Sequence, residues 1–127
     1  MFGSKKEKEN KTDKMSYLTW IPLTTIHQLE EIKQQSNTKT VLIFKHSTRC
    51  GISSMVIKRF EAMFKEEHQS FSVYYLDLLN YRNISDEIGF TFQVMHQSPQ
   101  LLIIKNGVSV FHASHYDILE TNLTRFL

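Results

Sequence analysis

The chain has 127 residues, of which 41% are hydrophobic and 12% aromatic, so its length suits one folded domain and its composition excludes an intrinsically disordered chain. No apolar run is long enough for a transmembrane helix, and the single cysteine excludes an internal disulfide. The net charge of +2 is accounted for by residues 5–14, which hold five lysines against three acidic residues. The neutral remainder gives no support for nucleic-acid binding.

This distribution predicts a disordered, charged leader over residues 1–15, followed by one folded domain over residues 16–127. The leader lacks the apolar stretch of a secretory signal. We therefore expect a cytoplasmic protein, in which a single cysteine stays reduced. Neither composition nor charge favours a membrane or a nucleic acid as partner, and we expect a monomer.

The first half of the domain alternates between helix and strand signals. Residues 20–22 are typical of a short strand or turn, and Thr25 and Gln28 have the spacing of a helix capping box. The apolar repeat that follows predicts a helix over residues 25–35. The segment TVLIFK at 40–45 is short, apolar and rich in β-branched residues, which predicts a buried strand.

The alternation continues to the end of the chain. The remaining patterns predict a helix from residue 51 to about 67, a strand over 72–78, a helix over 83–92 opened by Ser85, a strand over 100–105, a turn at Asn106-Gly107, a strand over 108–112, and a closing helix from Ser114 or His115 to Leu127. With right-handed βαβ crossovers, this order predicts an α/β thioredoxin-like fold. Its mixed central sheet would have four to five strands flanked by helices.

Cys50 is the first candidate for chemistry. It follows the strand at 40–45 and stands at the start of the next helix, where unpaired N–H groups and the positive end of the helix dipole favour a thiolate. Lys45, His46 and Arg49 are close enough in sequence to add positive potential. The alternative is a structural role, with the cysteine packed as a small hydrophobic residue.

Ser53 stands where the second cysteine of a C-x-x-C motif would be, because the sequence from Cys50 is C-G-I-S. A dithiol oxidoreductase uses that second thiol to resolve its own mixed disulfide. Only a monothiol mechanism is open here, with an external thiol completing the cycle. We expect the Ser53 hydroxyl to donate a hydrogen bond, either to the backbone or, weakly, to the Cys50 sulfur.

Pro99 is the second clue, because Ser98-Pro99 directly precedes the strand at 100–105. Thioredoxin-like folds carry a cis-proline at this point, which predicts a cis Ser98–Pro99 bond. The loop would then lie beside the helix that bears Cys50. The exposed backbone before Pro99 would be able to pair with an extended substrate.

Three of the six histidines, His46, His96 and His115, are expected near the end of the sheet that carries Cys50, where they are candidate accessory groups. No pair of these residues has a metal-ligand spacing of the H-x3-H or C-x2-C kind, so we predict no metal site. A Cys–His hydrolase is disfavoured, because no third orienting residue is evident and a chain of this length leaves little room for a substrate cleft.

Several motifs, taken together and in order, resemble one family. The segment F-K-H-S-T-R-C-G-I-S-S-M at 44–55 resembles the T-C-P-I-S stretch of the YtxJ-type monothiol bacilliredoxins, which belong to the thioredoxin-like superfamily. That family's second strand, H-x-S-P-Q turn, hairpin and aromatic-H-x-S-H-aromatic end are matched by residues 74–77, 96–100, 105–107 and 111–116. The resemblance spans about residues 20–127.

The resemblance implies a monothiol thiol-disulfide oxidoreductase that removes bacillithiol, or a similar low-molecular-weight thiol, from protein mixed disulfides. Its partners would be S-thiolated proteins and the small thiol, which acts as co-substrate, and no cofactor would be bound. Cys50 would be the nucleophile. The residues implied around it are Thr48, Arg49, Gly51 and Ser53 in the active-site loop, and Ser98 and Pro99 for substrate binding.

One residue departs from the family pattern, because Gly51 stands where the family has proline. Glycine restores an N–H near the sulfur and loosens the turn. The resulting C-G-x-S motif also resembles the C-G-F-S monothiol glutaredoxins, which carry an iron–sulfur cluster, but their T-V-P and G-G-x-D motifs are missing from this sequence. Two alternatives to an oxidoreductase therefore stay open: a non-catalytic partner-binding module and, less favoured, an iron–sulfur carrier.

Overall fold

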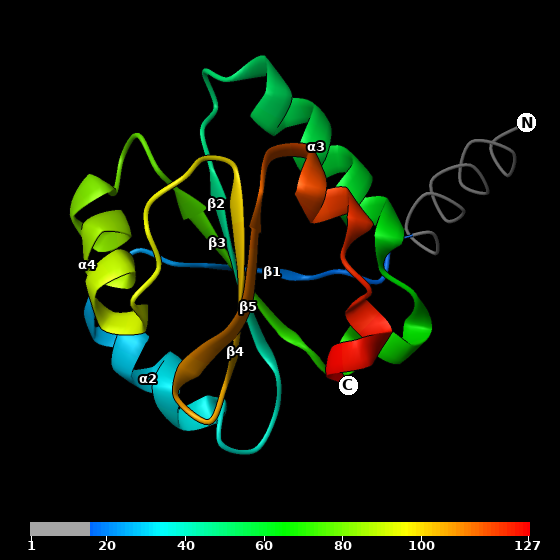
Figure 1. The fold of residues 1–127 in the computed structure, drawn as a ribbon, viewed down its shortest axis with the longest axis horizontal. Coiled ribbons are helices and arrows are strands. Elements are labelled where there is room, and N and C mark those ends of the chain that lie inside the picture. Colours follow the sequence, from blue (N-terminus) through cyan, green and yellow to red (C-terminus); the bar gives the residue numbers. More distant parts are fainter. Residues whose placement is uncertain (1–15) are drawn as a thin grey trace, which may run out of the picture.

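The structure is a computed structural model that describes residues 16–127; the predicted leader lies outside the described residues. The elements are, in chain order, β1 (Trp20–Pro22), α2 (His27–Gln35), β2 (Val41–His46), α3 (Gly51–Met63), η1 (Glu66–Ser70), β3 (Ser72–Asp77), α4 (Arg82–Phe92), β4 (Gln100–Lys105), β5 (Val108–Ser114), η2 (His115–Glu120) and η3 (Leu123–Phe126), where η marks a short 3-10 helix. The sheet stands between two helical layers, with α2 and α4 on one side and α3, η2 and η3 on the other (Figure 1).

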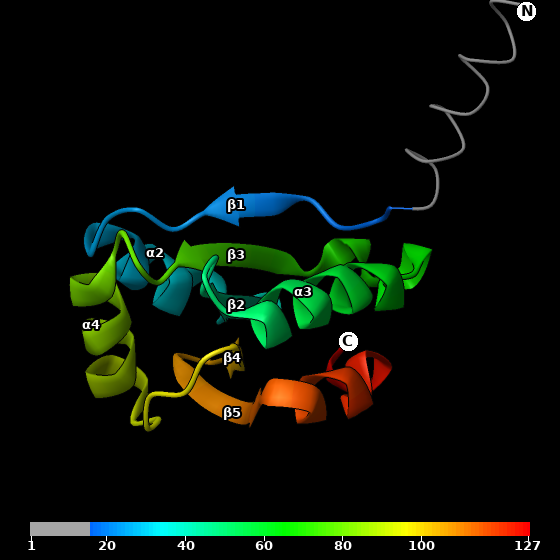
Figure 2. The same ribbon diagram turned by 90° about the horizontal axis from the view of Figure 1, so that it is seen from above.

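The five strands form one mixed sheet in the order β1-β3-β2-β4-β5. Figure 2 shows this order from above. β1 and β2 both run parallel to β3, whereas β4 runs antiparallel to both β2 and β5. The α/β organisation therefore matches the predicted fold class, at the upper end of the expected number of strands.

β2 is the central strand, and all six of its side chains are buried. Its register is set on both edges, with Lys45 opposite Leu76 of β3 and Gln100 of β4. Because successive side chains of a strand point to opposite faces, Phe44 and Ile43 enter different halves of the core. The same alternation places the last two residues of the strand on opposite faces.

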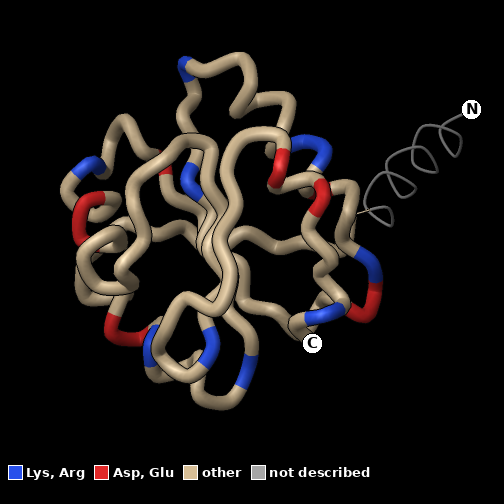
Figure 3. Tube along the Cα trace, in the orientation of Figure 1, with Lys and Arg blue, Asp and Glu red and all other residues tan. Residues whose placement is uncertain are grey.

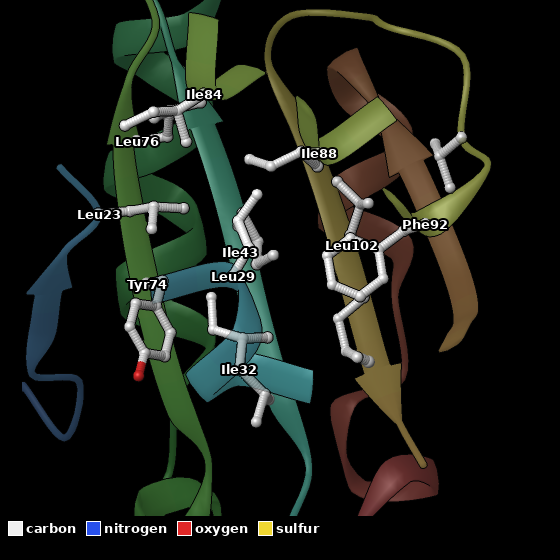
Figure 4. Packing of buried hydrophobic residues seen from close by; sticks show 13 residues of the cluster. Leu23, Leu29, Ile32, Ile43, Tyr74, Leu76, Ile84, Ile88, Phe92 and Leu102 are labelled. Atoms are coloured by element: carbon white, nitrogen blue, oxygen red, sulfur yellow. The ribbon is translucent and has the colours of Figure 1, made fainter. Parts of the chain in front are cut away.

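Each face of the sheet packs against its own apolar cluster. The cluster under α2 and α4 is drawn in Figure 4 and includes Leu29, Ile43, Tyr74, Ile88 and Leu102. The cluster under α3 is more aromatic. Its Phe44 and Phe60 rings lie 5.1 Å apart, and Trp20 of β1 packs edge-on against Phe44 at 5.8 Å.

Residues of both charge signs lie along the chain on both sides of the sheet (Figure 3). No helix within residues 16–127 is both long and apolar enough to cross a membrane.

The two reciprocal bonds of the capping box predicted at Thr25 are present, although α2 itself begins at His27, two residues later than predicted, with Ile26 as its N-cap. The Thr25 hydroxyl accepts the Gln28 N–H at 3.3 Å, and the Gln28 side-chain oxygen accepts the Thr25 N–H at 3.0 Å. Ser85, in contrast, does not open α4. It lies inside that helix and is buried, because α4 begins three residues earlier at Arg82.

Two helices differ from their predicted lengths. α3 ends at Met63 rather than near residue 67, because Phe64 and Lys65 are extended and the Lys65 N–H donates to the His68 ring. The predicted closing helix is wrong, since residues 115–127 form two 3-10 helices instead. Extended backbone at Thr121 separates them and lets both short helices bury an apolar side chain in the cluster under α3.

Removing the ring of Phe60 provides a test of the core. Phe60 is fully buried between Phe44 and Phe64, so Phe60→Ala is expected to lower the free energy of unfolding by about 3–5 kcal/mol in denaturant titrations. Phe90 is 74% exposed, and Phe90→Ala is the matched control, with an expected change within about 0.5 kcal/mol. Equal effects of the two substitutions would contradict the described packing.

Candidate functional site

The candidate site lies where β2 ends and α3 begins. Cys50 is the N-cap residue of α3, in an extended conformation, and is partly exposed. Its N–H donates to the Ser47 carbonyl at 3.1 Å, and its own carbonyl accepts the Ser54 N–H at 3.1 Å. Thr48 and Arg49, just before it, are exposed. The thiol therefore sits at the positive end of a 13-residue helix, within reach of solvent.

Ser53 is completely buried beneath the loop that carries Cys50. Its hydroxyl accepts the Ser47 N–H at 3.1 Å and shares a hydrogen bond of 2.7 Å with Nδ1 of His46. These partners differ from both expectations, because the hydroxyl accepts from the backbone instead of donating to it, and its second partner is His46 rather than the Cys50 sulfur. Ser53 thus fastens the start of the loop to the first turn of α3.

The protonation state of His46 follows from its surroundings. Burial lowers the pKa of His46, and the carboxylates of Asp77 and Glu61 only partly oppose this effect. The ring is therefore neutral near pH 7, with one bare nitrogen. If Nδ1 is the bare nitrogen, Ser53 donates its hydrogen to it and keeps its lone pairs for the Ser47 N–H, so every group in the pair is satisfied.

The loop before β4 forms the second wall of the site. The Ser98–Pro99 peptide bond is cis, as the sequence predicts, and the Pro99 carbonyl accepts the His115 N–H at 3.0 Å. Gln100 ties the loop from within, because its side-chain N–H donates to the Met95 carbonyl at 3.0 Å. Since Lys45 and Gln100 are paired across β2 and β4, this loop leaves the sheet at the same end as the Cys50 loop (Figure 1).

Lys45 is fully buried. The other side chains of β2 on the same face of the sheet, Val41 and Ile43, are apolar. Its Nζ is 3.2 Å from Nδ1 of His96, and the same ring nitrogen is 3.4 Å from the Ser85 hydroxyl. No Asp or Glu of residues 16–127 lies within 4.0 Å of Nζ. Burial lowers the pKa of Lys45 to about 8, against an opposing effect from Asp86.

The three predicted histidines do not form one cluster. His46 lies on the α3 face of the sheet, His96 bonds to Lys45 on the α4 face, and His115 is exposed at the start of η2. Within the described part of the chain, no group of three or more His, Cys, Asp or Glu side chains is placed to hold a metal ion. Lys45, expected to act near the thiol, lies on the other face because strand residues alternate.

Sequence reasoning missed three polar contributors to the site: the Lys45–His96 bond, Ser85 and Gln100. One signal was available for the first. Lys45 belongs to the strand at 40–45, which its apolar run predicts to be buried, and a buried lysine needs a partner. Nothing local to Ser85 or Gln100 distinguishes them from ordinary helix and strand residues.

A cavity of about 360 Å³ lies at the other end of the sheet. Its lining includes Thr40, Phe71 and Lys105. It contains none of the predicted site residues, because Thr40 precedes β2 whereas Cys50 follows it.

A family model described as monothiol bacilliredoxin BrxC matches residues 21–123. The chain belongs to the monothiol bacilliredoxin family. This membership confirms the predicted resemblance and supports a thiol-redox function.

Solved structures support the fold. One protein, described as a candidate oxidoreductase with a thioredoxin fold, is 33% identical over 84% of this chain and 91% of its own, with a TM-score of 0.71. The thioredoxin of Malassezia sympodialis is 20% identical over 86% of this chain and 90% of its own, with a TM-score of 0.69. A Schistosoma mansoni thioredoxin pre-protein is 20% identical over 87% and 100%, with a TM-score of 0.65. The predicted thioredoxin-like fold is thereby confirmed.

The buried ammonium of Lys45 predicts a pH-dependent stability. Below pH 8 both the folded and the unfolded chain carry the charge, so the folded state bears the full cost of burial. Between pH 8 and about 10.5 only the unfolded chain keeps the proton, so this contribution makes the protein more stable as pH rises. The cost relieved is about 3 kcal/mol, at roughly 1.4 kcal/mol per pKa unit.

Lys45→Met removes this contribution and is expected to flatten the rise in unfolding free energy between pH 8 and 10, measured by denaturant titration. Lys58→Met replaces an exposed lysine of α3 and is expected to keep the wild-type slope. Parallel curves for wild type and Lys45→Met would show that the ammonium bears no cost of burial.

Gly51 can be tested by the residue that the family carries there. A Cβ at Gly51 would meet nothing within 4 Å, and Cys50 has φ −99° and ψ 119°, which a residue before proline requires. The N–H lost lies at the first helical position, where it has no partner within the helix. Gly51→Pro is therefore expected to stabilise the fold by about 0.4–1 kcal/mol.

The melting temperature measures this effect, and Ser54→Pro is the control. Ser54 donates its N–H to the Cys50 carbonyl, so proline at that position is expected to cost about 3 kcal/mol or more. A lower melting temperature for Gly51→Pro would contradict the described start of α3.

Proposed function

We propose that the protein removes bacillithiol, or a similar low-molecular-weight thiol, from protein mixed disulfides, with Cys50 as the nucleophile. One observation carries the proposal: the only cysteine of the chain is a partly exposed N-cap residue at the end of the sheet where the cis-proline loop also lies. Membership of the monothiol bacilliredoxin family supports the same class of chemistry.

In the proposed step, the Cys50 thiolate attacks the sulfur of the small thiol within the mixed disulfide. A new S–S bond joins Cys50 to the small thiol, while the bond between the small thiol and the substrate protein breaks. The substrate cysteine leaves as a thiolate and takes a proton from solvent. The number of disulfide bonds does not change, so this step needs no oxidant or reductant.

The cycle then depends on a second thiol, because position 53 carries a hydroxyl instead of a resolving thiol. A low-molecular-weight thiol attacks the mixed disulfide at Cys50 and leaves with the first one as a small-molecule disulfide. Cys50 returns as a thiolate, and the small disulfide is reduced elsewhere. The helix N-terminus stabilises the thiolate both as the attacking and as the leaving group.

We assign the other residues by their places around the thiol. Thr48, Arg49 and Gly51 shape the exposed part of the loop, and Ser98 and Pro99 receive the extended substrate. His115 borders this wall through its backbone bond to Pro99. We further propose that the protein acts as a cytoplasmic monomer without a bound cofactor, and that its partners are S-thiolated proteins and the small thiol rather than a nucleic acid or a membrane.

The test uses a substrate protein that carries bacillithiol on one cysteine, with both partners followed by intact mass. Wild type is expected to gain the mass of the small thiol as the substrate loses it. Cys50→Ser is expected to lose transfer completely, because a serine hydroxyl cannot form the new bond. Ser54→Ala, one turn along the same helix, is the control and is expected to transfer at the wild-type rate.

Two results would contradict the proposal. One is a substrate that Cys50→Ser still strips. The other is a wild type that binds the substrate without ever gaining the adduct mass, which would favour the partner-binding module instead.

A further inference from the structure

The two walls of the site meet at the end of one strand. The first wall is the Cys50 loop (residues 47–50), and the second is the Pro99 loop (residues 93–99). The last two residues of β2 are Lys45 and His46: Lys45 bonds directly to the second wall, and His46 reaches the first through Ser53 of α3. Both side chains are buried, and neither has a part in the proposed exchange of sulfur bonds.

His46 reaches the Cys50 loop through Ser53. The Ser53 hydroxyl is the junction, because it bonds both to His46 Nδ1 and to the N–H of Ser47, the first residue of the loop. The Ser47 carbonyl in turn accepts the N–H of Cys50, the N-cap of α3, at 3.1 Å. Whatever holds the Ser53 hydroxyl therefore also holds Ser47 and, through it, the backbone at Cys50.

Lys45 reaches the Pro99 loop through His96. An ammonium only donates, so Nδ1 of His96 accepts and the ring is neutral at the 3.2 Å contact. His96 precedes the cis Ser98–Pro99 bond by two residues. The bond thus joins the buried centre of the sheet to the segment that would meet a protein substrate.

Stability alone does not explain Lys45. The preceding four residues of β2, from Val41 to Phe44, are apolar and fully buried. Apolar residues of similar volume often replace buried charges without loss of stability. At position 45 such a replacement would avoid burying an ammonium that has no carboxylate partner among residues 16–127.

We propose that Lys45 and His46 are positioning residues that hold the two walls independently. His46 sets the reactivity of the Cys50 thiol through Ser53, and Lys45 sets the binding of the S-thiolated protein through His96. The separation follows from strand alternation, since the two side chains leave β2 on opposite faces. This inference rests on the proposed function for its second half only.

The experiment measures two quantities in each variant. The pH midpoint of Cys50 alkylation by iodoacetamide reports the thiol alone. The KM and kcat for a protein mixed disulfide report substrate binding as well. His46→Leu is expected to shift the alkylation midpoint by at least half a pH unit, whereas His96→Leu is expected to leave it unchanged and to raise KM at least fivefold with kcat within twofold.

Asparagine variants provide the conservative rescue, because Oδ1 of asparagine lies close to where Nδ1 of histidine lies and also accepts a hydrogen bond. His46→Asn is expected to restore the wild-type midpoint, and His96→Asn to restore KM within twofold. His68→Leu is the matched control. That histidine is buried and bonds through both ring nitrogens, but it lies in η1, and its loss is expected to change neither quantity.

The outcomes separate the two proposals. If wild type transfers no small thiol, the proposed function fails, while the alkylation data still decide the role of His46. The inference itself is overturned if both leucine variants change both quantities, if neither changes either, or if asparagine rescues neither. If a leucine variant does not fold, the bonded partner decides: Lys45→Met must raise KM with the midpoint unchanged, and Ser53→Ala must shift the midpoint.

Discussion

The register of β2 between its two neighbours determines where every polar group of the site lies. This strand is hydrogen-bonded on both edges, and a slip of one residue would send all its side chains to the opposite faces. Lys45 and His46 would then exchange walls, and the apolar residues before them would change clusters. The two apolar clusters therefore stabilise the fold and also determine the faces of the sheet on which Lys45 and His46 lie.

Much of the fold is predictable because its signals are local. The buried strand at 40–45, the hairpin at Asn106-Gly107 and the capping box at Thr25 each depend on residues within a few positions of one another, and the structure contains all three. The position of Cys50 at the start of a helix follows from the same kind of pattern. The cis bond at Pro99 was predictable only through the likeness of the whole order to a known fold.

The rest depends on distant contacts. Lys45 and His96 are 51 residues apart, and only the pairing of β2 with β4 brings them together. The end of α3 and the break at Thr121 depend on which apolar side chains pack into the core. The helical repeat of the sequence does not contain this information. His46 and Ser53 are only seven residues apart, yet their bond crosses a turn whose shape the sequence does not specify.

The buried hydroxyl of Ser53 also bears on how this chain could acquire a second thiol. A cysteine at that position would restore the spacing of a dithiol motif, but a thiol is a weak donor and a weak acceptor. It would leave the Ser47 amide and the His46 ring poorly paired in a place that water does not reach. Gaining a resolving thiol would thus require a coordinated change at His46. The packing of the Cys50 loop therefore depends on a hydroxyl, and not a second thiol, at position 53.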